Sequence, residues 1–232
     1  MGKLANKTAV VTGASSGIGA AISKVLASEG ANVVLAARRV DKLREAEQEI
    51  NRNGSGKALA VQADISKRAD AENVIKQADE AFGSVDILVN NAGQMLTGTV
   101  QSGKVDEWEQ MIDVNIKGVL YGINAVLPSM IERSSGHIIN IASVSGLEVT
   151  KMSTVYSATK FAVRAISTGL EKELARTGVR VTNISPGMVD TRLSGGFGDR
   201  KKLEADDIAN AVVYALTQPG YVNVNEITVR PV

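Results

Sequence analysis

The chain has 232 residues, of which 44% are hydrophobic and 22% charged, and its net charge is +1 at pH 7. This balance is typical of a globular protein and gives no sign of a nucleic-acid or membrane-surface partner. Cysteine is absent, so disulfides, thiolate catalysis and cysteine-bound zinc are excluded, and the single histidine, His137, cannot build a histidine metal cluster. The N-terminal segment lacks a signal-peptide pattern, and no apolar run reaches the ~18 residues that span a bilayer. We therefore expect a cytoplasmic protein without a metal site or membrane segment.

Seven short stretches have the composition of β-strands, and helical patterns separate them. Several of these strands are apolar throughout, which is typical of a sheet that helices cover on both faces. Regular alternation of strand and helix predicts an α/β protein of the Rossmann type, with a doubly wound, seven-stranded parallel sheet in a single domain over 1–232. The predicted strands are 7–12, 32–37, 57–63, 85–90, 137–143, 179–185 and 225–231.

The first predicted strand runs directly into the sequence TGASSGIG, which precedes a helical pattern. Gly13, Gly17 and Gly19 would allow a tight turn, the close approach of a pyrophosphate, and close packing of helix on strand. Free N–H groups at the start of the helix attract an anion, and the hydroxyls of Ser15 and Ser16 add donors. This placement between strand and helix predicts a dinucleotide site, although a plain glycine-rich turn remains the alternative.

The second predicted strand ends in LAARR, about 20 residues after the glycines, where a dinucleotide fold contacts the adenosine ribose. An acid at this place would bind a free 2′-hydroxyl, but the chain has Arg38 and Arg39, and a guanidinium binds a phosphate bidentately. We therefore predict a preference for NADP(H) over NAD(H). The nearest acid, Asp41, is expected to be the N-cap of the next helix. The alternative is that both arginines are solvated at a helix entry.

Tyr156 and Lys160 lie four positions apart in a helical pattern, so both side chains can face one cleft. A free tyrosine has a pKa near ~10, too high for efficient proton exchange at neutral pH. At an effective dielectric constant of ~20 and a distance of ~5 Å, one positive charge stabilises a phenolate by about 3 kcal/mol, or roughly 2 pKa units. The lysine is therefore predicted to lower the pKa of the tyrosine and make it an acid–base group. From spacing alone, two exposed side chains are the usual outcome for such a pair.

With these motifs together, the chain resembles the short-chain dehydrogenase/reductase family over essentially its whole length. The matching segments are TGASSGIG (12–19), NNAG (90–93), VNIKG (114–118), the serine of NIAS (143), YSATK (156–160) and SPG (185–187).

The resemblance implies a catalytic tetrad of Asn115, Ser143, Tyr156 and Lys160. Tyr156 would pass a proton to the substrate oxygen while a hydride moves between the nicotinamide and the carbonyl carbon. Ser143 would hydrogen-bond the same oxygen, and Lys160 would bind the nicotinamide ribose. Asn115 would hold a water molecule that connects Lys160 to solvent.

The resemblance also assigns cofactor contacts to the ends of several strands, where ligands bind in open α/β sheets. Asn90 and its neighbour Asn91 could instead tie the sheet together, Asp64 could be a turn residue, and His137 is expected to be structural. The predicted cofactor contacts are Gly13, Ser15, Ser16, Gly17, Ile18, Gly19, Arg38, Arg39, Asp64, Ile65, Asn90, Ala92, Gly93, Tyr156, Lys160, Pro186, Gly187, Val189 and Thr191.

The chain departs from the family pattern in two places. NADP-preferring relatives often carry a basic residue where Ser16 stands, which leaves a 2′-phosphate to Arg38, Arg39 and the serine hydroxyls. The segment 193–202, either a lid or a loop, is short, and the ending NEITVRPV resembles the branch that acts on small hydroxy acids and carbonyls. The expected substrate walls are Met95, Leu96, Ser145, Leu147, Glu148 and Met152.

Together these features predict an NADP(H)-dependent oxidoreductase that interconverts a secondary alcohol or hydroxy acid with its carbonyl compound. A redox sensor or regulator that binds NADP(H) without turnover is the alternative, and an epimerase or dehydratase would need an extra acid or a larger substrate domain. The resemblance further implies a homo-oligomer, a dimer or tetramer, formed by helices over about 105–133 and 153–177.

Overall fold

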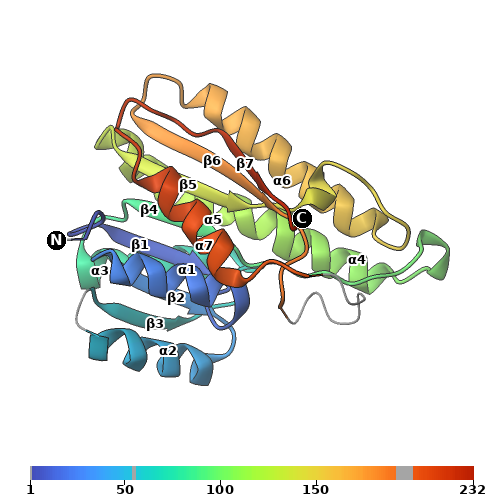
Figure 1. The fold of residues 1–232 in the computed structure, drawn as a ribbon, viewed down its shortest axis with the longest axis horizontal. Helices are drawn as coiled ribbons and strands as arrows, with labels where there is room; N and C mark the ends of the chain where they lie inside the picture. The colour runs from blue at the N-terminus through green and yellow to red at the C-terminus, as the bar shows by residue number, and fades with distance from the viewer. Residues whose placement is uncertain (1, 54–55, 192–200) are drawn as a thin grey trace.

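The computed structural model describes residues 2–53, 56–191 and 201–232, and the seven predicted strands form one parallel sheet (Figure 1). The order across the sheet is β3-β2-β1-β4-β5-β6-β7. The strands are β1 Thr8–Thr12, β2 Asn32–Ala37, β3 Ala58–Gln62, β4 Ile87–Asn90, β5 Gly136–Ile141, β6 Val179–Pro186 and β7 Glu226–Val229.

Helices follow the strands and cover both faces of the sheet (Figure 1). The α-helices are α1 Gly17–Ser28, α2 Val40–Asn53, α3 Arg68–Phe82, α4 Val105–Ile112, α5 Gly118–Glu132, α6 Thr154–Glu173 and α7 Ala205–Leu216. Short helical turns are η1 Val100–Ser102, the π-helical η2 Asp113–Lys117 and η3 Val144–Gly146.

Two apolar clusters, one on each face of the sheet, hold the fold together. α1, α2 and α7 pack on one face, and α3, α5 and α6 on the other. Val10 and Val11 are neighbours in β1 but belong to opposite clusters, because successive side chains of a strand point to opposite faces. Both residues are fully buried, which explains why the central strands are apolar throughout.

Three predicted helix limits differ from the structure. The helix expected over 105–133 changes to π-helical hydrogen bonding at η2, between α4 and α5. The helix expected over 153–177 ends at Glu173, because the chain turns through left-handed Arg176 (φ 71°) into β6. Asp41 was wrongly predicted as an N-cap: α2 begins at Val40, so this carboxylate lies within the first turn, where it still favours the positive end of the helix dipole.

No membrane-spanning segment was expected, but the helical run Val105–Glu132 is long and apolar enough to be a candidate. Its length of 28 residues and mean hydropathy of 1.2 over an 18-residue window would suffice by composition alone. A core helix can have the same properties, and α5 buries Val126 and Met130 in the cluster on its face of the sheet. Core packing therefore accounts for the apolar residues on the buried side of α5.

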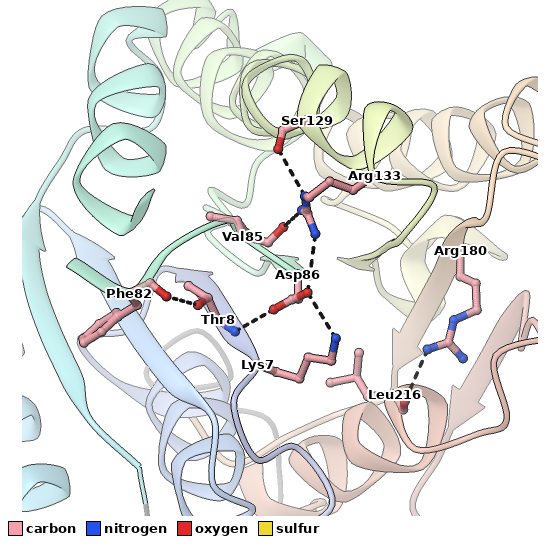
Figure 2. A network of polar contacts seen from close by, with 9 residues as sticks. All are labelled: Lys7, Thr8, Phe82, Val85, Asp86, Ser129, Arg133, Arg180 and Leu216. Carbon is pink, nitrogen blue, oxygen red and sulfur yellow. Dashed lines mark hydrogen bonds and ion pairs between the residues drawn. The ribbon is translucent and has the colours of Figure 1, made fainter. Parts of the chain in front are cut away.

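A polar network joins the amino ends of the strands, at the edge opposite the ligand-binding edge of such a sheet (Figure 2). Asp86, directly before β4, accepts a hydrogen bond from the Thr8 backbone N–H at 3.0 Å and lies 3.6 Å from Arg133 Nη1. Arg180 of β6 donates to the Leu216 carbonyl oxygen at the end of α7 (3.3 Å). These charges connect strands to helices.

His137 is buried in β5, where its Nε2 lies 2.8 Å from the Thr182 hydroxyl. Its Nδ1 has no hydrogen-bond partner among the described residues. Burial, and then the positive charge of Arg180, lower the pKa of His137 to about 3. These contacts support the predicted structural role.

We expect His137 to make the fold sensitive to acid. Below pH 6.5 the unfolded chain takes up a proton that the folded chain excludes until about pH 3, so stability falls as the pH falls through this range. His137→Gln keeps a polar amide near Thr182. It should reduce the slope of the free energy of unfolding against pH by up to about 1.4 kcal/mol per pH unit. Urea unfolding of both proteins between pH 7.5 and 4.5 measures the difference, and equal slopes would contradict the role of His137.

Candidate functional site

A cavity of about 1080 Å³ lies at the carboxyl ends of the strands. In the sheet, β1 lies between β2 and β4, so the connection after β1 and the connection after β3 run in opposite directions across the sheet. In a doubly wound sheet, ligands bind in the crevice at this point. The residues that line it include Gly13, Ser15, Ser16, Gly17, Ile18, Gly19, Arg38, Arg39, Asp64, Ile65, Ala92, Gly93, Ser143, Tyr156, Lys160, Pro186, Gly187, Val189 and Thr191.

The glycine-rich turn forms one wall of the cavity and presents an open helix N-terminus. Gly13 and Gly17 both have left-handed backbone angles (φ 69° and 55°), which a side chain would strain. A Cβ atom on Gly13 would also lie only 2.8 Å from Asn91 Nδ2. The side chain of Ser16, the N-cap of α1, makes no capping hydrogen bond among the described residues. The first N–H groups of the helix can therefore bind an anion.

Arg39 lies beside this turn. Its Nη2 is 2.7 Å from Ser16 Oγ and 3.1 Å from Ser15 Oγ. The guanidinium and both hydroxyls therefore form one group of donors at the edge of the cavity, and Arg38 lines the same cavity. This donor set fits a phosphate attached to the adenosine ribose.

Asp64 lines the cavity after β3 and also forms a turn, so its position is compatible with the predicted cofactor contact as well as with the turn. Its Oδ1 accepts hydrogen bonds from the Ser66 N–H (3.2 Å) and hydroxyl (2.7 Å). Partial burial alone would raise the pKa of the Asp64 carboxyl, but the Ser66 bonds, then Arg38 and Lys67, outweigh burial and hold it below the usual value. The carboxylate is therefore ionised at neutral pH.

Ser143, Tyr156 and Lys160 meet at the opposite end of the cavity from Arg39. Tyr156 and Lys160 are both buried in the first half of α6, and Lys160 Nζ lies 5.9 Å from the centre of the tyrosine ring. Lys160 Nζ donates to the Ile141 carbonyl oxygen at 2.9 Å, which fixes the ammonium beneath the cavity. Ser143 Oγ accepts a hydrogen bond from the Ser145 N–H at 3.1 Å.

The pKa of Tyr156 differs from the prediction. Burial raises it above the ordinary value, and a hydrogen bond with Ser143 only partly offsets this. Burial also lowers the pKa of Lys160 to about 8. The prediction counted the attraction of one ammonium for a phenolate and omitted the cost of burying the phenolate itself. Tyr156 is therefore protonated at neutral pH and available as a proton donor.

Asn115, which was predicted to hold a water molecule between Lys160 and solvent, lies in η2 and does not line the cavity. Its amide clamps the backbone of Gln94: Oδ1 accepts from the Gln94 N–H (2.8 Å), and Nδ2 donates to the Gln94 carbonyl (2.9 Å). Nδ2 also donates to the Thr159 hydroxyl (2.9 Å). A Cβ atom on Gly93 would lie 3.5 Å from both Asn115 Oδ1 and Lys160 Nζ, so both side chains lie close to Gly93.

Asn90 was predicted as a cofactor contact, with a tie between strands as the alternative, and its side chain makes such a tie. It is buried in the sheet, where Nδ2 donates to Asn140 Oδ1 at 2.9 Å, and it does not line the cavity. The next residue, Asn91, lines the cavity and donates to the Thr12 carbonyl (2.8 Å). Side chains alternate along a strand, so only the strand's register decides which of two adjacent asparagines faces the ligand.

A comparison with protein families matches residues 7–202 to the short chain dehydrogenase family. The chain belongs to this family. It is 58% identical over 231 residues to an "uncharacterized oxidoreductase" of Staphylococcus aureus, with 99% of each chain covered. Among solved structures, it resembles an alcohol dehydrogenase from Thermococcus sibiricus complexed with 5-hydroxy-NADP (TM-score 0.90, 33% identity, 97% of each chain). It also resembles a closed form of serine dehydrogenase complexed with NADP⁺ (TM-score 0.89, 36% identity, 96% of this chain and 94% of that one).

In this short-chain dehydrogenase, the substrate end of the cavity differs from the prediction. Met95 and Ser145 line it as expected, whereas Leu96, Leu147, Glu148 and Met152 do not. Glu148 instead pairs with Arg230, at 3.1 Å between Oε1 and Nη1. The predicted lid or loop, 193–202, lies outside the described residues except for its last two positions.

Several lining residues were missed. Thr12 ends β1, and its hydroxyl accepts hydrogen bonds from the N–H groups of Asn91 and Ala92, both at 3.0 Å. Its place at the carboxyl end of the first strand was a usable signal. Thr150 and Lys151 also line the cavity of this short-chain dehydrogenase. They lie in an irregular segment where no periodicity shows direction.

Proposed function

We propose that the chain is an NADP(H)-dependent oxidoreductase that interconverts a secondary alcohol or hydroxy acid with its ketone or aldehyde. The observation that carries the proposal is that Ser143, Tyr156 and Lys160 line the same cavity as the glycine-rich turn and Arg39. The NADP ligands of two solved relatives support the cofactor, and the serine dehydrogenase supports a small hydroxy acid as substrate. We propose that the whole chain, 1–232, acts as a single cytoplasmic domain.

Residues at the ends of several strands would hold the cofactor. The N-terminus of α1 would bind the pyrophosphate, and Arg39, with Arg38 and the serine hydroxyls, would bind the 2′-phosphate. Asp64 and Ile65 would contact the adenine, and residues from the end of β6, Pro186 to Thr191, would contact the nicotinamide. When bound, the nicotinamide supplies or accepts the hydride.

Tyr156 acts as the general acid of carbonyl reduction, since burial keeps its hydroxyl protonated. Ser143 donates a hydrogen bond to the same substrate oxygen and stabilises its developing charge. Lys160 stabilises the phenolate left after proton transfer. Asn115 is a positioning residue, because its amide holds the backbone of Gln94, and Gln94 follows Gly93, which lies close to the lysine.

A panel of ketones, aldehydes and secondary alcohols, followed through nicotinamide absorbance with NADPH and NADH, tests this function. We expect turnover with NADPH and a clear preference over NADH. The competing function is a redox sensor that binds NADP(H) without turnover, and the filled positions of the four predicted catalytic residues argue against it. Tight NADPH binding without turnover across the panel would favour the sensor.

We infer that the chain forms a homo-oligomer, a dimer or tetramer, through α4, α5 and α6. These helices expose Ile112, Leu120, Ile131 and Phe161, each with 39–44% of its surface accessible. Exposed apolar side chains of this size are common at subunit interfaces. Light scattering of the purified chain measures the assembly, and a monomer at micromolar concentration would contradict it.

A further inference from the structure

The turn from Thr150 to Ser153 lies at the substrate end of the cavity, directly before α6. The Ser153 N–H donates to the Thr150 carbonyl at 3.3 Å, which closes a four-residue turn with Lys151 in second position. The serine hydroxyl donates to the same carbonyl (2.9 Å) and lies 2.8 Å from the Thr150 hydroxyl. From the segment between β4 and η1, the Gly98 N–H donates to the Met152 carbonyl at 2.8 Å. The turn is therefore fixed from inside and from a neighbouring loop.

Met152, third in the turn, has a left-handed backbone angle (φ 65°) and an exposed side chain. Such an angle costs a residue with a Cβ about 1 kcal/mol or more, and residues held in it are concentrated at functional sites. The side chain of Met152 does not line the cavity. Its left-handed backbone conformation therefore matters for the shape of the turn. The turn in turn places Thr150 and Lys151 on the cavity wall, with Ser145 and Tyr156.

The charges around this end of the cavity leave one cation uncompensated. Glu148, three residues before Lys151, pairs with Arg230 at 3.1 Å, and Asp190, on the cavity wall, lies 3.5 Å from Lys202. Lys151 forms no hydrogen bond or ion pair with any residue in the described ranges. The only other lysine on the cavity wall among those residues is Lys160, which is buried beneath Tyr156.

We propose that Lys151 is a specificity-determining residue that binds the carboxylate of an anionic substrate, a hydroxy acid or the corresponding keto acid. The turn fixes the backbone of Lys151 on the cavity wall that Ser143 and Tyr156 also line. In the proposed binding mode, a short acid places its carboxylate on Lys151 and its carbonyl oxygen between Tyr156 and Ser143. The proposal rests on the proposed function and narrows it to acids. A neutral carbonyl compound would use the catalytic groups without the lysine.

The test compares acetoacetate with its uncharged methyl ester as substrates for NADPH oxidation. In wild type, kcat/KM should favour the acid, and added salt should weaken the preference because it screens an exposed ion pair. Lys151→Met should lower kcat/KM for the acid about tenfold, in line with the loss of a hydrogen bond to a charged group, and change the ester by less than about twofold. Lys151→Arg should restore most of the loss. Lys57→Met, at an exposed position before β3 on the opposite edge of the sheet, is the matched control.

The outcomes separate the two proposals. Equal losses for acid and ester in Lys151→Met would mean a structural role and overturn the assignment. Wild-type reduction of the ester or of other neutral carbonyls, without reduction of acetoacetate, would overturn the lysine proposal and leave the oxidoreductase intact. Failure to reduce any carbonyl compound, despite NADPH binding, would overturn both.

Discussion

Tyr156→Phe is expected to lower the rate of carbonyl reduction by about 10²–10⁴-fold, the range by which a positioned general acid accelerates proton transfer. The substitution removes one hydroxyl and keeps the buried ring. Because Tyr156 is protonated at neutral pH, the lost group is a proton donor in the reducing direction. NADPH affinity should change by less than about threefold, since neighbouring groups, not the phenol, hold most of the cofactor.

The measurement is single-turnover reduction of the best panel substrate, together with NADPH binding followed by fluorescence. Tyr214→Phe is the matched control, because this tyrosine is 57% exposed on α7 and does not line the cavity. A Tyr156→Phe enzyme that retains more than a tenth of the wild-type rate would remove the tyrosine from its proposed role. Loss of NADPH binding would instead indicate a disturbed site.

Replacing Arg38 and Arg39 together by alanine is expected to raise the KM for NADPH by roughly 10²-fold and the KM for NADH by less than about threefold. Hydrogen bonds to charged groups contribute about 1.5–3 kcal/mol each, and the 2′-phosphate is the only group that distinguishes the two cofactors. Arg39 should account for most of the effect, because it already lies against the Ser15 and Ser16 hydroxyls.

Steady-state kinetics of both single variants and the double variant, with each cofactor, measure this effect. Arg44→Ala removes an exposed guanidinium from the next turn of α2 and serves as the control. Added salt should reduce the NADPH preference of wild type, because it screens the exposed guanidinium. An equal rise in KM for NADPH and NADH would mean that the arginines do not bind the 2′-phosphate and are only solvated residues before α2.

Three features of the site could not be predicted from sequence patterns. The two adjacent asparagines at the end of β4 have equal chemistry, yet the side chain of Asn90 lies within the sheet and Asn91 lines the cavity. Glu148 looked like an acid in the substrate wall, but Arg230, 82 residues later, removes it from that role. The sign of the pKa change at Tyr156 depended on burial, which spacing does not report. Each outcome depends on groups distant in the chain.

Local signals were sufficient for the strands, for the glycine-rich turn after β1 and for the i, i+4 placement of Tyr156 and Lys160. These features depend on composition and periodicity within a dozen residues, so the sequence by itself determined them. Only the tertiary structure decided which polar side chains line the cavity, which carboxylates are neutralised, and that Lys151 stands without a partner among the described residues. The physical reason is that solvation and charge compensation are set by every element packed around a group, and the chain brings those elements together only when it folds.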